Sequence, residues 1–203
     1  MTLPASTVSA FLNDLAAKTA TPGGGAAACL TGATAASLAH MVVAFSLGRK
    51  SLVEHQPALE AASTKLLALR DDFTRLADED AQAYGALNAA MKLPADDPAR
   101  AATLATSARA ATDVPQRALA RALDLLRLAE SLRPITNPYL RSDLAIAAVL
   151  ADAAARASRW NIAINAPTLD EAAPGEGSAA LQAAERACAD AAALLESIET
   201  QCA

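Results

Sequence analysis

A long hydrophobic stripe between two prolines limits most strongly what this chain can fold into. Apolar side chains recur every three or four residues from Pro57 onward, and no proline follows until Pro94. That spacing predicts one helix of about 35 residues, which is about 50 Å long. A helix of this length buries its stripe only against other long helices. The stripe consists of Leu59, Leu66, Leu69, Phe73, Leu76, Tyr84, Leu87 and Met91.

Composition extends the helical prediction to the whole chain. Alanine, the strongest helix former, makes up more than a quarter of the 203 residues, whereas aromatic residues make up only 3%. We therefore expect residues 1–203 to form a single all-α domain, an elongated antiparallel bundle of long helices. The other predicted helices cover 6–18 (capped by Ser6), 26–47, the segment from 99 to the loop at 133–139, 142–164, and the segment from Ser178 onward.

Two prolines predict interruptions of this pattern. The residue before a proline avoids the helical region, so Pro115 predicts a kink or break near Asp113 and Val114, with Thr112 or Asp113 capping the second piece. Pro167 and the glycines that follow it predict a loop over 167–177.

Charge and cysteine content narrow the class of protein. The net charge of −5 argues against nucleic acid as a partner, since phosphate-backbone binders carry basic faces. Three cysteines without a CxxC spacing do not form a disulfide framework, and the first residues lack the charged and apolar regions of a secretory signal. These features favour the cytoplasm.

The uncharged stretch from Ala26 to Leu47 is long enough to span a bilayer. It consists mostly of alanine, however, and includes Thr34, Ser37 and His40. Alanine is barely lipophilic and no aromatic belt flanks the stretch, so we expect a helix buried among other helices and no membrane contact.

Asp80 is the first residue that hydrophobic patterning does not explain, because it lies on the long stripe between Leu76 and Tyr84. A buried carboxylate is costly unless it is paired or hydrogen-bonded. One interpretation is a salt bridge or a cap on a neighbouring helix. The other is burial without a cationic partner, which would raise the pKa of Asp80 and suit it to general acid or base chemistry.

A glycine run stands directly before the apolar helix, in the segment Thr21-Pro22-Gly23-Gly24-Gly25. Glycines let backbone N–H groups approach a ligand, and a helix amino terminus carries a partial positive charge. The run therefore fits either an anion-binding loop or a tight turn between closely packed helices.

Three further polar features each have an ordinary structural interpretation. The second of them, a pair of asparagines, has a functional interpretation as well. Ser142 and Asp143 follow a stiff loop at a helix start, where both are good caps. Asn161 and Asn165 share one face of an apolar helix, where they read the edge of a heterocycle or finish the helix. Lys50 follows the exit of the apolar helix, where a cation complements the helix dipole.

Metal and thiol chemistry find little support in the sequence. His40 and His55 are fifteen residues apart and belong to no metal-binding motif, so we expect no metal site. Cys29 has no histidine close in sequence, and packing is its expected role.

Several short motifs occur in order along almost the whole chain. They are Thr21-Pro22-Gly23-Gly24-Gly25 before an alanine-rich helix, Leu47-Gly48-Arg49-Lys50, Asp80 with Ala83-Tyr84, Leu93-Pro94, Ala111-Thr112-Asp113-Val114-Pro115, Asn137 with Ser142-Asp143, and Asn161 with Asn165. In this order they resemble the cyclodeaminase/cyclohydrolase family of folate one-carbon enzymes.

The resemblance implies an all-helical fold that forms a homodimer and binds a tetrahydrofolate derivative in a helix-lined cleft or at the dimer interface, with no metal or other cofactor. It implies that Asp143, Asp80 and Lys50 are catalytic, one aspartate acting as acid or base while the other orients the pterin or water. The implied substrate-binding residues are Thr21, Pro22, Gly23, Gly24, Gly25, Tyr84, Asn137, Ser142, Asn161 and Asn165.

The expected activity is that of a 5,10-methenyltetrahydrofolate cyclohydrolase, which forms 10-formyltetrahydrofolate. One alternative is formimidoyltetrahydrofolate cyclodeaminase activity, which releases ammonia through a similar tetrahedral carbon. A second alternative is a non-catalytic helical dimer that binds folate or another protein.

Overall fold

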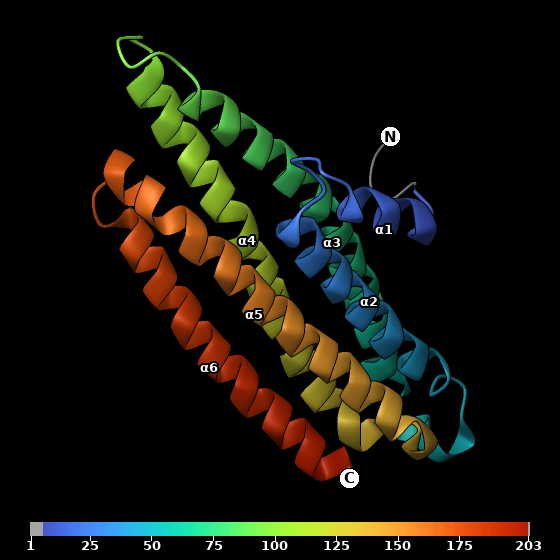
Figure 1. Ribbon diagram of the computed structural model, residues 1–203. Helices are drawn as coiled ribbons and strands as arrows, with labels where there is room; N and C mark the ends of the chain where they lie inside the picture. Colours follow the sequence, from blue (N-terminus) through green and yellow to red (C-terminus); the bar gives the residue numbers. More distant parts are fainter. Residues whose placement is uncertain (1–5, 203) are drawn as a thin grey trace.

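The computed structural model describes residues 6–202, and every regular element in that range is helical (Figure 1). The 36-residue α3 confirms the helix predicted from the long stripe. All-α architecture is likewise confirmed. The α-helices are α1 (Val8–Ala16), α2 (Gly24–Ala44), α3 (Gln56–Met91), α4 (Arg100–Leu132), α5 (Arg141–Ala172) and α6 (Glu176–Cys202), and the short 3₁₀ turns are η2 (Lys50–His55), η3 (Arg133–Ile135) and η4 (Pro138–Leu140).

Four of the long helices form a closed ring, in which α2 packs on α3, α3 on α4, α4 on α5, and α5 returns to α2. Helix α6 covers the outer side of α4 and α5 (Figure 1). Short connections make successive long helices antiparallel, so α5 also runs antiparallel to α2. The amino terminus of α2 therefore lies beside the carboxyl-terminal half of α5.

Small residues let α2 sit close to its neighbours. Ala35, Ala36 and Ala39 are completely buried. A Cβ atom added at Gly32 would lie 2.4 Å from the ring of Phe73, so α2 and α3 could not pack this closely with a larger residue there. By length and composition α2 could cross a membrane, but 56% of its apolar window is buried inside the bundle. The predicted buried helix is thus confirmed on one side, while an uncharged stripe stays exposed on the other.

Of the kink or break predicted at Pro115, the break is wrong, because α4 continues from Arg100 to Leu132. Proline removes one helical hydrogen bond, the one that its N–H would donate to the carbonyl of Ala111. That carbonyl instead accepts a 2.8 Å hydrogen bond from the side-chain amide of Asn165. Pro115 is itself buried, so tertiary packing holds the helix together, and Thr112 bonds back to the carbonyl of Ala108 rather than capping a new helix.

The predicted loop over 167–177 is also wrong for most of its length, since α5 continues to Ala172 with Pro167 inside it. Pro167 lies on the exposed side of the helix, where water can solvate the carbonyl that loses its partner, while Leu169 beyond it is buried. Helix α6 accordingly begins two residues before the predicted cap Ser178, whose hydroxyl donates to Asp170.

Two other boundaries shift by a few residues. Helix α1 is shorter than predicted and is capped by Thr7 rather than by Ser6, the Thr7 hydroxyl oxygen accepting from the N–H of Ala10 at 3.1 Å. Helix α2 ends at Ala44, and the chain then turns through Gly48, whose φ of 74° favours glycine.

Candidate active site

Asp80 lies against the first turn of α2, although it belongs to the middle of α3. Its carboxylate accepts the backbone N–H of Ala26, one of the amides that has no partner inside α2. Helix α2 starts after Gly23 without any side-chain cap of its own. Asp80 therefore serves as a cap from a neighbouring helix, which was one of its two predicted roles.

Gly25 makes this contact possible. A Cβ atom added at Gly25 would lie 2.0 Å from Oδ1 of Asp80, a distance that forces the carboxylate to move. The glycine run thus forms a close packing contact in addition to any role toward a ligand.

The electrostatic surroundings of Asp80 oppose its ionisation. Burial raises the pKa of Asp80, and the hydrogen bond from the Ala26 N–H offsets part of that shift. Within residues 6–202, no cation forms an ion pair with Asp80, and Arg75 and Arg117 pair with the adjacent Glu79 instead. Burial also raises the pKa of the Cys29 thiol to about 12, with the charges of Asp80 and Glu79 adding to the shift. Asp80 thus combines both predicted roles, because it is a cap and also a half-buried carboxyl without a cation.

A cavity of about 400 Å³ opens beside Asp80, a volume in the range of small-molecule sites. Its walls come from α3, α5, one position of α4, the first residues of α2 and the loop before α2. The lining residues are Ala20, Thr21, Gly23, Gly24, Gly25, Asp80, Tyr84, Leu87, Met91, Ala111, Asn161, Ile164, Asn165 and Thr168. Eight of the predicted site residues therefore meet in one place, namely Thr21, Gly23, Gly24, Gly25, Asp80, Tyr84, Asn161 and Asn165. Pro22 is half-buried in the same loop but does not line the cavity.

The rim of the cavity is apolar and open. Tyr84 and Met91 on α3 are 44% and 45% exposed, and Ile164 on α5 is 75% exposed. Leu87, Met91 and Ile164 were not predicted as site residues. A signal was present, because Leu87 and Met91 continue the stripe beyond Tyr84, and Ile164 stands between the two asparagines.

The other predicted site residues lie near the opposite end of α2. Ser46, just beyond that end, accepts a 2.8 Å hydrogen bond from the backbone N–H of Asn137. Lys50 is exposed and lies four residues after Ser46 in the chain. Ser142 is exposed and Asp143 is half-buried, both in the first turn of α5.

Asn137 is committed to local structure at that end. It is 6% exposed, and its side-chain oxygen accepts the N–H of Tyr139 to cap η4. Its predicted role toward a substrate is not visible in these contacts and stays a prediction.

Asp143 and Asn161 occupy the same face of α5 but at different ends. They are eighteen residues apart, which corresponds to five turns and about 27 Å along the helix. Within one chain, the structure therefore brings Asp80 and the asparagines together and leaves Asp143 and Lys50 far from them.

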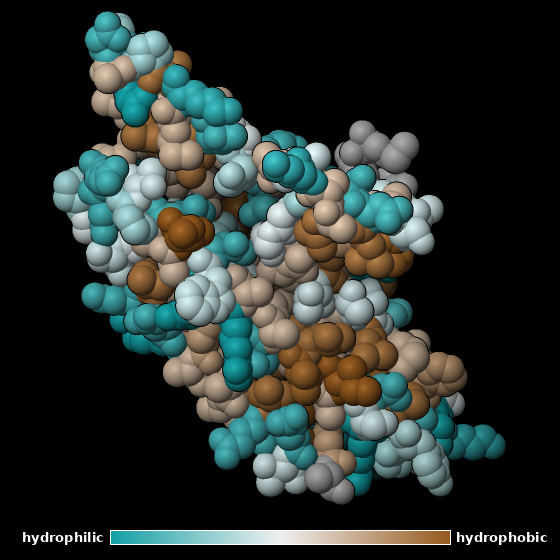
Figure 2. All heavy atoms as spheres, viewed as in Figure 1, coloured by the Kyte–Doolittle hydropathy of each residue, from teal (hydrophilic) through white to brown (hydrophobic). Residues whose placement is uncertain are grey.

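The surface between these two ends is partly apolar, and on α5 it also carries the exposed Arg156, which lies on the same helix face as Val149. On α2 it includes Leu38 and Met41, and beyond the helix Phe45, which is 62% exposed. On α5 it includes Ile146 and Val149, which are 49% and 42% exposed. Figure 2 shows hydrophobic surface gathered over this part of α2 and α5. We call it the α2–α5 face.

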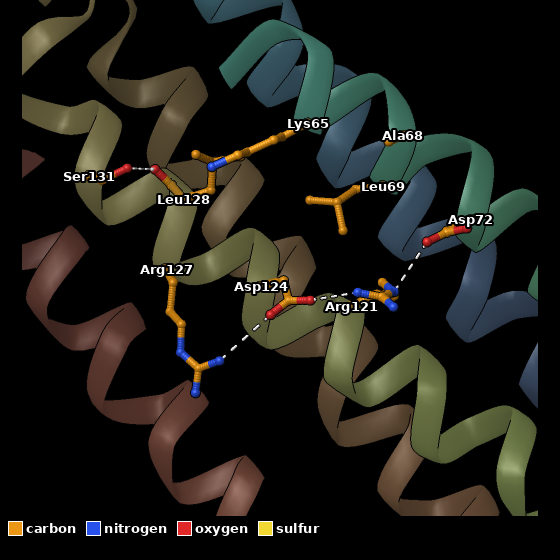
Figure 3. A pocket seen from close by; sticks show the side chains of 9 residues that line it. All are labelled: Lys65, Ala68, Leu69, Asp72, Arg121, Asp124, Arg127, Leu128 and Ser131. Carbon is orange, nitrogen blue, oxygen red and sulfur yellow. Dashed lines mark hydrogen bonds and ion pairs between the residues drawn. The ribbon is translucent and has the colours of Figure 1, made fainter. Parts of the chain in front are cut away.

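A second groove of about 500 Å³ runs between α3 and α4 and is the one drawn in Figure 3. Arg121 bridges it, with ion pairs of 3.2 Å to Asp72 and 2.8 Å to Asp124, and Arg127 approaches Asp124 to 3.7 Å. The ion pair between Arg121 and Asp72 ties α4 to α3, and among the cations that line the groove only Lys65 has no ion pair within the described residues.

In the part of the chain that the structure describes, no set of side chains is arranged to bind a metal ion. No group of three or more His, Cys, Asp or Glu side chains there is placed to hold an ion. The chemistry of the cavity depends on a carboxyl, two carboxamides and backbone N–H groups.

Comparisons with known proteins show which family shares this sequence and architecture. A family model described as formiminotransferase-cyclodeaminase matches residues 7–180. The chain is 34% identical over 196 residues to methenyltetrahydrofolate cyclohydrolase from Methylorubrum extorquens, an alignment that covers 95% of this chain and 93% of that protein. It is 34% identical over 167 residues to formimidoyltransferase-cyclodeaminase from Sus scrofa, covering 76% of this chain but only 29% of that longer protein.

Among solved structures, formiminotetrahydrofolate cyclodeaminase from Thermotoga maritima superimposes with a TM-score of 0.87 at 25% identity. The match covers 98% of this chain and 96% of that one. The fold and the relatives agree with the resemblance drawn from the sequence. The chain belongs to the formiminotransferase-cyclodeaminase family, whose members include cyclohydrolases and cyclodeaminases.

Proposed function

We propose that this protein hydrolyses 5,10-methenyltetrahydrofolate to 10-formyltetrahydrofolate in the cavity beside Asp80. The observation that carries the proposal is a carboxyl, free of any ion pair within the described residues, at the wall of a cavity of suitable size. The methenyl substrate is a cation whose charge is shared by N5, N10 and the carbon between them. A carboxylate in a poorly solvated site attracts such a cation strongly.

The reaction needs one proton acceptor and one proton donor near the bridging carbon. The oxygen of a water molecule attacks that carbon while the Asp80 carboxylate accepts a proton from the water. The resulting tetrahedral carbon bears N5, N10 and a hydroxyl group. The bond from the carbon to N5 then breaks as N5 takes up the proton held by Asp80. The hydroxyl loses its own proton to solvent as it becomes the formyl carbonyl, so the cationic substrate gives a neutral product and one released proton. One water is consumed, and the formyl group remains on N10.

The walls of the cavity suit a reduced pterin. Tyr84, Met91 and Ile164 present exposed apolar surface, which a flat ring can cover. Asn161 and Asn165 offer carboxamide groups that can pair with the polar edge of the ring. The N–H groups at the start of α2, next to the glycines, favour a substrate carboxylate or a developing negative charge.

Hydrolysis is favoured over deamination because, of the two proteins that match along nearly their whole length, the cyclohydrolase has the higher identity, 34% against 25%. The alternative is cyclodeamination, which the overall match to the Thermotoga maritima cyclodeaminase supports. There, N10 would attack the formimino carbon, and ammonia would leave from a tetrahedral carbon like the one in hydrolysis. The same carboxyl would serve either reaction.

We also propose that the active form is a homodimer that buries the α2–α5 face. A stretch without charge from Ala26 to Leu47, half of whose residues are not fully buried in one chain, is typical of a surface that a partner covers. A two-fold axis through the middle of that face would exchange its two ends. The Asp143 end of one subunit would then meet the Asp80 end of the other, which would give Asp143 and Lys50 their predicted catalytic roles.

The test of the activity is a pair of assays on the purified protein. The first follows decay of the methenyltetrahydrofolate chromophore above its spontaneous rate, and the second measures ammonia released from formimidoyltetrahydrofolate. We expect activity in the first, and we expect Asp80→Asn and Asp143→Asn each to lower turnover by about 10²-fold or more. Activity in the second assay alone would establish the cyclodeaminase, and activity in neither would favour a non-catalytic folate-binding or interaction dimer.

The shared site is tested by mixing the two inactive variants. If each site uses Asp80 of one subunit and Asp143 of the other, a mixed dimer contains one intact site, and random exchange restores about one quarter of the wild-type activity. A mixture of Asp80→Asn with Asp80/Asp143 double-variant subunits is the matched control and should stay inactive. No recovery between folded, exchanging subunits would remove Asp143 from the shared site.

We place the enzyme in the cytoplasm. All three cysteines are unpaired, as is usual for proteins of reducing compartments.

A further inference from the structure

Pro115 leaves a gap in the hydrogen bonding of α4 at the wall of the cavity. A proline has no N–H group, so the carbonyl of Ala111, four residues earlier, lacks its helical donor. Ala111 is also one of the residues that line the cavity. A buried carbonyl without a donor is costly, and the structure supplies the donor from another helix.

Asn165 of α5 supplies that donor, with its Nδ2 atom 2.8 Å from the carbonyl oxygen of Ala111. The orientation of the carboxamide follows from chemistry, because a carbonyl only accepts and so only the NH₂ side of Asn165 can face it. The side-chain oxygen must then point to the other side. Asn165 lines the cavity, and Oδ1 has no hydrogen-bond partner among residues 6–202.

Asn161, one turn earlier, provides a contrast on the same wall. Its carboxamide forms no hydrogen bond within residues 6–202, and its Oδ1 lies 3.5 Å from where a Cβ at Gly24 would be. Asn161 can therefore turn either its oxygen or its nitrogen to a ligand, whereas Asn165 can offer only its oxygen.

We infer that Asn165, oriented by the Ala111 carbonyl that Pro115 leaves free, is a specificity-determining residue that selects a heterocycle with an N–H donor. The inference rests on the proposed function, since a reduced pterin carries such donors at its ring N8–H and on its exocyclic amino group, and we assign one of these two to Asn165. Pro115 is a positioning residue in this scheme. It fixes the hydrogen-bonding character of the wall without contacting the ligand.

The experiment measures dissociation constants of tetrahydrofolate and two analogues by titration calorimetry. The 8-deaza analogue replaces the ring N8–H by CH₂, and the 2-desamino analogue lacks the exocyclic amino group. An oriented acceptor that faces no donor costs about tenfold in affinity or more. We therefore expect wild-type protein to bind one analogue at least about tenfold more weakly than tetrahydrofolate, and Asn165→Ala to bind that analogue and tetrahydrofolate equally weakly.

Two further variants keep the test decisive. Asn161→Ala is the matched control and should keep the wild-type discrimination even if its affinities fall. Pro115→Ala returns a helical N–H to the Ala111 carbonyl without removing the Asn165 side chain. It should keep the helical circular dichroism and lose at least about half of the discrimination, because Asn165 is no longer the required donor. Since discrimination is a ratio of two dissociation constants for one variant, a general loss of stability leaves it unchanged.

Each outcome decides a different part of the inference. Wild-type binding of tetrahydrofolate without discrimination against either analogue, or discrimination that survives in Asn165→Ala, overturns the inference and leaves the proposed function standing. Discrimination that is undiminished in Pro115→Ala overturns the positioning role. Failure of the wild type to bind tetrahydrofolate at all overturns the proposed function and the inference with it.

Discussion

The two ends of the α2–α5 face hold aspartates in opposite surroundings. At one end, Asp80 is enclosed between α3 and the first turn of α2, and burial opposes its charge. At the other end, Asp143 lies half-buried in the first turn of α5, where the helix dipole favours its charge. The first environment depends on tertiary fit, down to the missing Cβ of Gly25, and the second on local helix geometry alone. Two residues of one type are thus prepared for different tasks.

The largest expected difference between the two ends lies in the reactivity of their cysteines. Cys29 stands behind Asp80, where burial raises its pKa from 9.0 to about 12, and the thiol is 2% exposed. Cys202 lies at the other end, where burial raises its pKa but the charges of Arg133 and Arg141 lower it. At neutral pH the higher pKa leaves Cys29 about 10³-fold less thiolate than an ordinary cysteine.

In the folded Cys188→Ser variant, we expect a thiol reagent to modify Cys202 long before Cys29. Mass spectrometry of the two cysteine-containing peptides follows both reactions. Comparable rates for Cys29 and Cys202 in the folded protein would show that the Asp80 end is open to water. In that case the contrast between the two ends would fail.

Gly25→Ala should produce the next largest effect, because it attacks the contact that encloses Asp80. The new Cβ would stand 2.0 Å from Oδ1, so the carboxylate must leave the Ala26 N–H or α2 must shift. Overpacking of this kind costs about 1–3 kcal/mol of unfolding free energy. Turnover should fall as well, since the carboxyl no longer faces the cavity in the same position.

Gly85→Ala is the matched control for this prediction. Gly85 lies on α3, the helix that carries Asp80, five residues after that aspartate. Nothing lies within 4 Å of a Cβ atom added at Gly85. Alanine there should stabilise the helix by up to about 1 kcal/mol and leave turnover unchanged. Urea denaturation of both variants provides the measurement, and equal stability of the two proteins would contradict the close contact at Gly25.

The sequence predicted the parts of this molecule that depend on periodicity. The stripe from Leu59 to Met91 predicted α3, and the position of Asp80 on that stripe marked it as a polar residue on a buried face. The glycine run and the paired asparagines also met at one cavity as the motifs implied. In each case the signal is local, because hydrophobic spacing or a glycine at a helix start needs no knowledge of the partner.

The wrong predictions have the opposite character. Pro115 was interpreted as a kink or break and Pro167 as the start of a loop, because local sequence shows only the lost N–H group. The replacement donor for Ala111 comes from Asn165, 54 residues away. Likewise the separation of Asp143 from Asp80 depends on which helices are neighbours and on their direction, and spacing within one helix does not contain that information.

The smallest expected effect is on the midpoint of thermal unfolding. Replacing Asp80 and replacing Asp143 by asparagine should shift that midpoint in opposite directions. Burial raises the pKa of Asp80 above its value in the unfolded chain. Its contribution to stability is therefore greatest below the unfolded pKa and falls as the pH rises to the folded pKa. Asp80→Asn removes this loss and still offers an oxygen to the Ala26 N–H, so it should raise the midpoint of thermal unfolding at neutral pH.

Asp143→Asn should act in the opposite direction. It removes a negative charge that complements the helix dipole in the first turn of α5, which costs about 0.3–1 kcal/mol. Thermal unfolding of the wild type and the two variants from low to neutral pH measures both signs at once. A lower midpoint for Asp80→Asn at neutral pH would mean that Asp80 is stabilised as an anion in the folded protein, and its surroundings would then be no different in kind from those of Asp143.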